Sequence, residues 1–184
     1  APACVTTDHP GYLSFIPSAP TKAAIAFDLV VSASSVYGGS WMEGSGAVFA
    51  ENEVLHWLAA EFGLPSGSGG VFMQGGTIGN LSALVTARDA ARRRDREAGR
   101  SDPARWVVVC SAEAHSSIKS AAAVMDADVV AAAPDDAALL HGEAVGGVLD
   151  EYPGAVFAVV GTGGTTNFGI VDDIASVAAS EIDG

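Results

Sequence analysis

The sequence predicts an α/β fold, with a mainly parallel sheet covered by helices on both faces. Continuous apolar runs typical of buried strands occur at 106–110, 128–131 and 155–160, and a helical stretch separates each run from the next. Strands in this alternation pair in parallel because each connection is long enough to cross the sheet. Helices then have to cover both faces. In such sheets ligands bind beyond the carboxyl ends of the strands, so we expect a site there.

Two long helices are predicted ahead of the first strand. In the first, over about 48–62, the apolar residues Val54, Leu58 and Phe62 recur on one face, and Gly63 provides a stop signal. This spacing indicates a helix with one apolar stripe.

The second long helix is predicted to follow residues 75–77, with Leu81, Leu84 and Val85 on one face. It ends in the basic cluster 92–96, which is most simply a solvated last turn that complements the helix dipole. Further helices are predicted between the strands, where an alanine-rich stretch follows the first strand and a segment from Asp136 to about Leu149 follows the second.

The composition favours a soluble, acidic, cytoplasmic protein. The 184 residues are 49% apolar and no repeat or linker divides them, so we expect one domain or a piece of a larger one. A formal charge of -13 opposes encounters with nucleic acid or an anionic membrane. No run approaches the roughly 20 apolar residues that span a bilayer. Cys4 and Cys110 are too few for a disulfide framework, and Cys110 should pack as a small hydrophobe.

A glycine-rich segment before the second long helix has the features of an anion site. Gly75, Gly76 and Thr77 stand where free backbone N–H groups and the positive dipole end favour a phosphate. Thr77 adds a hydroxyl donor. The alternative is an ordinary turn with Thr77 or Asn80 as the N-cap. A P-loop is excluded because no Gly-Lys-Ser/Thr sequence follows.

A second segment of small residues, 161–169, follows the apolar run at 155–160 and allows a ligand to approach the backbone. It partly matches a dinucleotide-binding fingerprint. Thr166, however, stands where that fingerprint needs glycine or alanine, so an NAD-binding module is a secondary alternative.

Among the four histidines, His115 lies where a site is expected. It follows the apolar run at 106–110 and should occupy a loop at the carboxyl edge of the sheet, although a helix-start or packing role is the alternative. We place His56 within the first long helix and His141 on a helix surface. No spacing of histidines and cysteines matches a metal site, so no metal is expected.

Several short segments recur in a consistent order through most of the chain. They are His9-Pro10, Phe15-Ile16-Pro17-Ser18, Ser40-Trp41, Glu51-Asn52-Glu53, Gly75 to Asn80, Ala114-His115-Ser116-Ser117 and Gly161 to Thr166. Taken together, they resemble the group II amino acid decarboxylases that depend on pyridoxal phosphate (PLP), a family with aromatic amino acid, histidine and glutamate enzymes. The resemblance implies the large domain of a type I PLP-dependent transferase fold, similar to aspartate aminotransferase, with residues 1–184 as its N-terminal portion.

The resemblance also implies how the cofactor is held. Gly76 and Thr77 would hold the phosphate through backbone and hydroxyl donors. His115 would stack on the pyridine ring as the expected catalytic residue and position a proton donor there. Thr162 would lie near the far side of the ring and its phenolic oxygen.

A loop near the N-terminus resembles the substrate pocket of the family. Phe15, Pro17 and Ser18 are its expected substrate-binding residues, and Ser18 would help to bind the substrate carboxylate. Ile16 stands where aromatic-specific relatives carry a ring, and Ser18 where they carry threonine. An aromatic substrate therefore does not follow from the resemblance.

The family also needs a lysine that bonds the cofactor and an aspartate that pairs with the pyridine nitrogen. Lys22 and Lys119 do not stand in the context of that lysine, and Asp172, Asp173 and Asp183 do not match that aspartate. We therefore expect either a split or cleaved enzyme, whose second polypeptide carries both groups, or a truncated product.

The implied function is decarboxylation of an L-amino acid to an amine and carbon dioxide, a step of amino acid and carboxylic acid metabolism. The chain would supply phosphate-binding and ring-stacking residues, be inactive alone, and form a homodimer or join a complementary chain that carries the lysine. The alternatives are other chemistry on the same fold, such as an aldehyde synthase or a carbon–sulfur lyase, and an inactive fragment or interaction module.

Overall fold

The computed structural model describes residues 7, 9–15, 18–133 and 138–180. Their contacts divide into two compact units, one up to Phe72 and one from Met73 onward, and each is described by itself. Within the described ranges, no helix combines the length and the apolar character needed to cross a bilayer. The assignment of the whole chain to one large domain stays a prediction.

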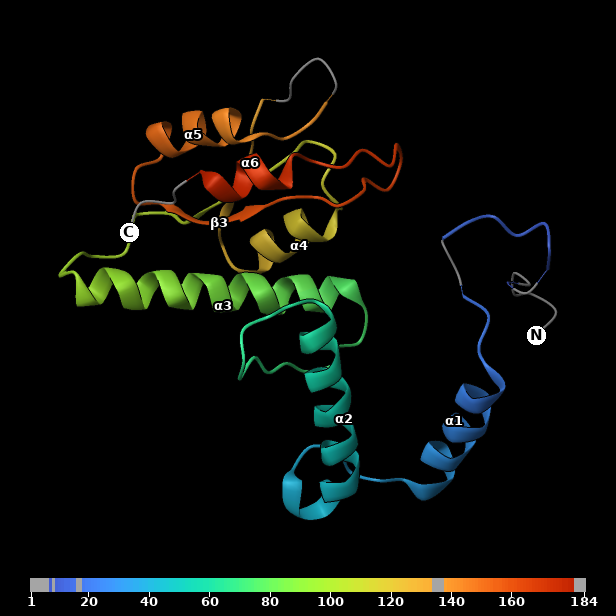
Figure 1. The fold of residues 1–184 in the computed structure, drawn as a ribbon. Coiled ribbons are helices and arrows are strands. Elements are labelled where there is room, and N and C mark those ends of the chain that lie inside the picture. The colour runs from blue at the N-terminus through green and yellow to red at the C-terminus, as the bar shows by residue number, and fades with distance from the viewer. Residues whose placement is uncertain (1–6, 8, 16–17, 134–137, 181–184) are drawn as a thin grey trace. The chain divides into compact units, whose positions relative to one another are not determined.

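The described part of the first unit contains α1 (Lys22–Ser34) and α2 (Trp41–Glu61) (Figure 1). Helix α1, which the sequence analysis did not anticipate, begins where Thr21 Oγ1 accepts a hydrogen bond from the backbone N–H of Ala24 at 3.1 Å. It ends at Ser35, whose φ of 48° is left-handed. A side-chain cap and a left-handed stop thus define this helix without a strong apolar stripe.

Helix α2 confirms the predicted helix over 48–62 and begins earlier, at Trp41. The extension is kinked at Gly44, whose backbone is not helical (φ -133°, ψ 34°). A Cβ atom at Gly44 would collide with the carbonyl oxygen of Tyr37, so only glycine fits there. Beyond the helix, the backbone N–H of Phe72 donates to Glu51 Oε1 at 2.9 Å and ties the following segment back to α2.

The second unit opens with α3 (Gly76–Glu97), which confirms the second predicted helix. The basic cluster at its end makes ion pairs, whereas the sequence analysis predicted a solvated last turn. Arg92 Nε lies 2.8 Å from Asp102 Oδ2, and Arg100 lies 2.7 Å from the buried carboxylate of Asp95. Residues beyond the helix fold back onto its last turns, a long-range feature that the local charge pattern does not reveal.

The sheet consists of β1 (Val107–Cys110), β2 (Asp128–Ala131) and β3 (Val156–Val160) in the order β2-β1-β3. Both pairings are parallel, with Val108 opposite Val129 on one side and Ala158 on the other. The predicted strands and their parallel arrangement are confirmed. Each parallel pair requires a crossover, which α4 (Ser117–Val124) and α5 (Gly142–Glu151) provide.

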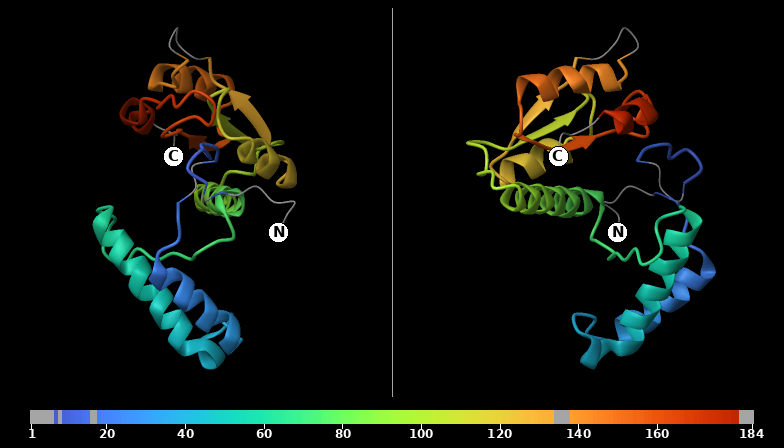
Figure 2. Two further views of the ribbon diagram at one scale, coloured as in Figure 1. Left: turned by 90° about the vertical axis from the view of Figure 1, so that its right-hand side faces the viewer. Right: turned by 60° about the vertical axis from the view of Figure 1, so that its left-hand side comes forward.

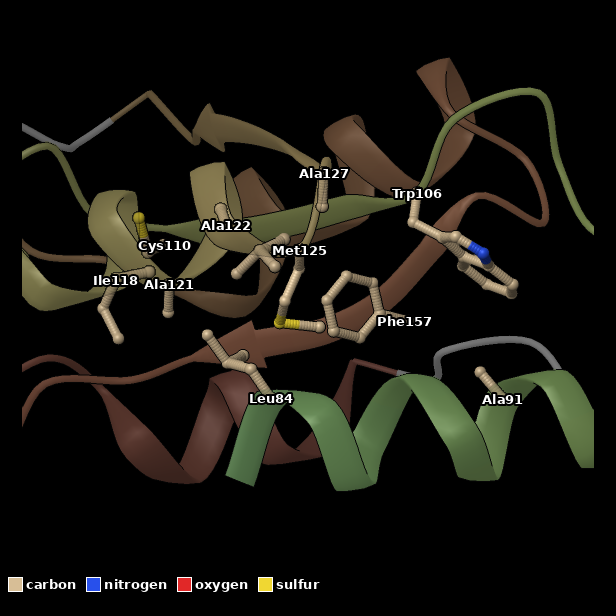
Figure 3. Packing of buried hydrophobic residues seen from close by; sticks show 11 residues of the cluster. Leu84, Ala91, Trp106, Cys110, Ile118, Ala121, Ala122, Met125, Ala127 and Phe157 are labelled. Carbon is tan, nitrogen blue, oxygen red and sulfur yellow. The ribbon is translucent and has the colours of Figure 1, made fainter. Parts of the chain in front are cut away.

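Helices cover both faces of this sheet, as predicted. On one face, α3 and α4 pack against Cys110 and Phe157; on the other, α5 and α6 (Ile174–Ala179) pack against Val109 and Val156. Figures 1 and 2 show the two layers on opposite sides of the strands (Figure 1, Figure 2). In the first layer, Leu84 of α3 points toward Met125 and Phe157 (Figure 3). The sheet is therefore held rigidly, and its carboxyl edge provides a fixed base for a site.

The helix predicted from Asp136 to about Leu149 starts later, and that boundary was wrong. Residues 134–137 lie outside the described residues, and Ala138 has a positive φ of 61°, which is incompatible with a helix. Helix α5 begins at Gly142, after His141 Nδ1 accepts from the backbone N–H of Ala144 at 3.4 Å. His141 is thus the N-cap of α5, which corrects the prediction that it lies on a helix surface.

Candidate cofactor site

The loop after β1 carries His115 at the carboxyl edge of the sheet, as the sequence predicts. Its exposed side chain lines an open pocket of about 300 Å³. Lys119 from α4 and the pair Thr166 and Asn167 from the loop after β3 line the same pocket. Segments that follow two neighbouring strands are therefore brought together at the edge where a parallel sheet binds ligands.

The start of α3 offers unpaired backbone donors. Gly75 is the N-cap, with a φ of 87° that favours glycine, and no side chain among the described residues caps this end. The first backbone bond of the helix runs from Gly79 N–H to Gly75 O at 3.2 Å, so the amides of Gly76, Thr77 and Ile78 precede the helical ladder. The alternative of Thr77 or Asn80 as N-cap is therefore excluded.

Asn80 connects this helix start to the loop that carries His115. Asn80 Nδ2 lies 2.8 Å from Ser117 Oγ, and Ser117 Oγ lies 2.8 Å from His115 Nδ1. The backbone N–H of Ser117 also donates to His115 Nδ1, at 3.2 Å. Ser117 is buried and Asn80 half-buried, so this chain of contacts is shielded from bulk water on the side away from the pocket. The sequence analysis missed both roles, although both residues lay within quoted motifs and Asn80 had also been considered as a cap.

Thr162 is positioned by a buried carboxylate. Asp172, which is 3% exposed, accepts from the backbone N–H of Thr162 at 2.7 Å and from that of Leu140 at 3.0 Å. The backbone N–H of Asp172 returns a bond to Thr162 O at 2.9 Å. Asp172 thereby closes the loop 161–172 at its base. This role was missed in the sequence, where Asp172 was weighed only as a partner for a pyridine nitrogen.

One titrating group beneath this edge, the thiol of Cys110, has a shifted pKa. Burial raises the pKa of the Cys110 thiol, and the positive charge of Lys119 opposes that shift. Cys110 is buried in the core beneath the loop, which confirms that it packs as a small hydrophobe. A buried thiol with a raised pKa is a poor nucleophile, so Cys110 does not contribute chemistry to the pocket.

The other predicted residues are distributed as follows. Phe15 and Ser18 are exposed and belong to the first unit, whereas Pro17 lies outside the described residues. Their substrate-binding role stays a prediction. No group of three or more histidine, cysteine or acidic side chains is arranged for a metal ion within the described ranges.

Comparison with known proteins identifies the family. The model of the pyridoxal-dependent decarboxylase conserved domain matches residues 1–181. An aromatic-L-amino-acid decarboxylase of Bacillus atrophaeus is 29% identical over 93% of the chain, and an L-2,4-diaminobutyrate decarboxylase of Rhizobium meliloti is 31% identical over 92%. The crystal structure of Oryza sativa TDC with PLP and tryptamine superposes with a TM-score of 0.77 and 29% identity, covering 89% of this chain and 36% of that chain.

The chain spans about a third of the length of these relatives, 35% of the Bacillus enzyme and 34% of the Rhizobium enzyme. The match nevertheless extends through both described units and includes the start of α3, the loop of His115 and the loop of Thr162. Its α/β architecture with a parallel sheet is that of the superposed structure. The chain thus belongs to the pyridoxal-dependent decarboxylase family.

Proposed function

We propose that this chain supplies the phosphate-binding and ring-binding part of a PLP site in an enzyme that decarboxylates an L-amino acid to an amine. The observation that carries the proposal is the Asn80–Ser117 contact of 2.8 Å. It joins the first turn of α3, where an anion would bind, to His115, where the ring would stack. Two halves of one cofactor therefore have their expected binding groups on adjoining elements.

The donors at the start of α3 fit a phosphate group. The amides of Gly76 and Thr77 are free of helical partners, and the Thr77 hydroxyl adds a further donor. Apart from its chain neighbours and the backbone of its own helix, no described atom lies within 4 Å of the Cβ position of Gly76, so a ligand has room to approach the backbone. These local donors matter because the formal charge of -13 repels an anion at long range.

The pocket beside His115 fits an aromatic, anionic ring. The imidazole is exposed to the pocket, and the ammonium group of Lys119 contributes a positive charge to the same lining. His115 would stack against the pyridine ring and hold a proton at its Nε2 atom, while Thr162 would face the phenolic oxygen. Bound PLP supplies the electron sink that stabilises the carbanion left when carbon dioxide departs.

The substrate and assembly are part of the same proposal. Phe15, Pro17 and Ser18 would contact the amino acid, with Ser18 at its carboxylate. The lysine that bonds the cofactor would come from a segment outside residues 1–184 or from a partner chain. The assembly would be a homodimer or an association with a complementary chain that carries this lysine. The free, buried thiol of Cys110 supports a cytoplasmic location. The two relatives are named for different amino acids, so the substrate class we propose is L-amino acids in general.

The test replaces the Thr77 hydroxyl in the native protein. Thr77→Val should weaken PLP affinity about tenfold, because one charge-assisted hydrogen bond is lost. Thr86→Val is the matched control on the same helix. The Thr86 hydroxyl donates to Ser82 O at 2.9 Å, away from the start of the helix, so its removal should leave the PLP affinity unchanged. Affinity is measured by fluorescence titration after removal of the cofactor.

Product analysis completes the test. Incubation with a panel of L-amino acids should release carbon dioxide and the matching amine, whereas an aldehyde would identify oxidative chemistry on the same fold. Equal PLP affinity in wild type and Thr77→Val, or a native protein that never binds PLP, would overturn the proposal.

A further inference from the structure

The contacts around His115 carry information about where its ring hydrogen lies. Hydroxyls, side-chain amides and neutral imidazoles can each reverse their hydrogen-bonding direction. Two directions are therefore consistent with the side chains alone. Either Asn80 donates to Ser117 and Ser117 donates to His115, or every donor and acceptor in this chain is exchanged.

The backbone decides between these two directions. A main-chain N–H always donates, and that of Ser117 lies 3.2 Å from His115 Nδ1 with donor geometry. Nδ1 must then present a lone pair, so it accepts from the Ser117 hydroxyl at 2.8 Å as well. With its hydrogen used in this way, Ser117 Oγ accepts from Asn80 Nδ2, also at 2.8 Å.

We propose that Ser117 and Asn80 are positioning residues that hold the neutral His115 ring in the tautomer with its hydrogen on Nε2. The network is shielded, because Ser117 is 3% exposed. Reversing the ring would leave the backbone N–H of Ser117 facing another donor, which is costly at a buried site. The preference is therefore built into the backbone at the start of α4.

The consequence for chemistry rests on the proposed function. With Nδ1 occupied by two donors, any hydrogen that His115 shares with a bound ligand is the one on Nε2. Glu113 and Lys119 are the charged residues that line the same pocket, and neither is bonded to the imidazole in the described structure. The ring is thus oriented by α3 and α4 rather than by the charges beside it.

The experiment measures the tautomer directly, by long-range ¹H–¹⁵N correlation in the native protein labelled with ¹⁵N-histidine and freed of cofactor. We expect the Nε2–H pattern for His115, with its signals identified by their loss in His115→Gln. Ser117→Ala should reduce the ratio of Nε2–H to Nδ1–H about tenfold, since one hydrogen bond to Nδ1 is removed. Ser117→Thr keeps the hydroxyl and should restore the ratio.

A second variant opposes the side-chain direction of the network without removing volume, and it should lower the ratio of Nε2–H to Nδ1–H, although the backbone N–H of Ser117 still favours Nε2–H. The carboxylate of Asn80→Asp can only accept, so the Ser117 hydroxyl turns toward it and its oxygen favours a hydrogen on Nδ1. Asn167→Asp places the same charge in the pocket beside His115, outside the network, and should leave the ratio unchanged. Thermal unfolding confirms that each variant is folded.

An Nδ1–H pattern in the wild type, or equal ratios in wild type and Asn80→Asp, would overturn the inference. Because no cofactor is present in the measurement, its outcome is separate from that of the proposed function. A protein with the Nε2–H tautomer that fails to bind PLP would retain the network and lose the proposed function.

Discussion

The two units differ in how far they bury their large apolar side chains. In the first, Phe27 of α1 is 69% exposed and Trp57 of α2 is 61% exposed, and α1 buries no residue at all. In the second, Val108 and Val109 of β1 are fully buried. Both units have apolar sequences, so composition alone does not distinguish them.

This difference in burial distinguishes a unit that has its own hydrophobic core from a unit whose apolar side chains are largely exposed. The second unit is a layered α/β structure in which helices bury both faces of the sheet, and this rigid base carries His115 and Thr162. Several large apolar side chains of α1 and α2 are exposed, and apolar side chains that gather on a protein surface are typical of association sites. This contrast is consistent with the assembly proposed above.

The largest expected effect comes from placing one charge in each unit of the native protein. Val109→Asp buries an unpaired carboxylate and should lower the free energy of unfolding by more than about 4 kcal/mol. Val30→Asp, on the exposed surface of α1, should change it by less than about 0.5 kcal/mol and should weaken self-association instead.

Denaturant unfolding with hydrogen exchange of the β1 amides measures the first quantity, and sedimentation measures the second. Similar losses of stability in the two variants would break the distinction between a unit with a core and a unit with an uncovered surface. An expressed but insoluble Val109→Asp protein would agree with it.

Much of the second unit follows from the sequence because its signals are local. Apolar runs rich in valine predicted all three strands, and the segment at Gly75 predicted the start of α3. The first unit was harder to predict from the sequence. Helix α1 has no strong apolar stripe, begins at the Thr21 cap and buries none of its residues, so no periodic pattern announces it. The start of α5 was misjudged because Ala138 takes a left-handed conformation that its residue type does not announce.

The residues of the candidate site likewise divide into those with a local sequence signal and those that depend on long-range contacts. His115 was placed at the sheet edge from its position after an apolar run, which is a local signal. Asn80, Ser117 and Asp172 were missed as positioning groups because each has a partner far along the chain. Asn80 and Ser117 are 37 residues apart, and Asp172 and Leu140 are 32 residues apart. Such contacts depend on how α3, α4 and the loop after β3 pack, which spacing does not reveal.

A smaller effect sharpens the comparison within the second unit, where the described buried polar side chains lie. Asp172→Asn should destabilise it by roughly 2 kcal/mol, because an amide offers one acceptor to two backbone donors and leaves one of them buried without a partner. Faster hydrogen exchange at the Thr162 amide should accompany the loss. Asp173→Asn, one residue on and exposed, is the matched control and should cost much less, since asparagine also caps helices. Equal losses in the two variants would contradict the role of Asp172.

The smallest expected effect compares one helix cap from each unit. Thr21 caps α1 and Asp173 caps α6, each through a side-chain oxygen 3.1 Å from a backbone N–H three residues ahead. Hydrogen bonds from Ser176 lower the pKa of Asp173, so its carboxylate is favoured in the folded state and its contribution is present above the ordinary aspartate pKa. That contribution should disappear as the pH falls through the lowered folded pKa, and α6 should fray while α1, with a hydroxyl cap, should not.

Hydrogen exchange of the two helices between neutral and acidic pH, corrected for the intrinsic rate, measures the difference. Asp173→Asn should remove the pH dependence in α6 because the amide does not titrate, and an α1 that frays in parallel with α6 would show that global acid unfolding, rather than the cap, controls both helices.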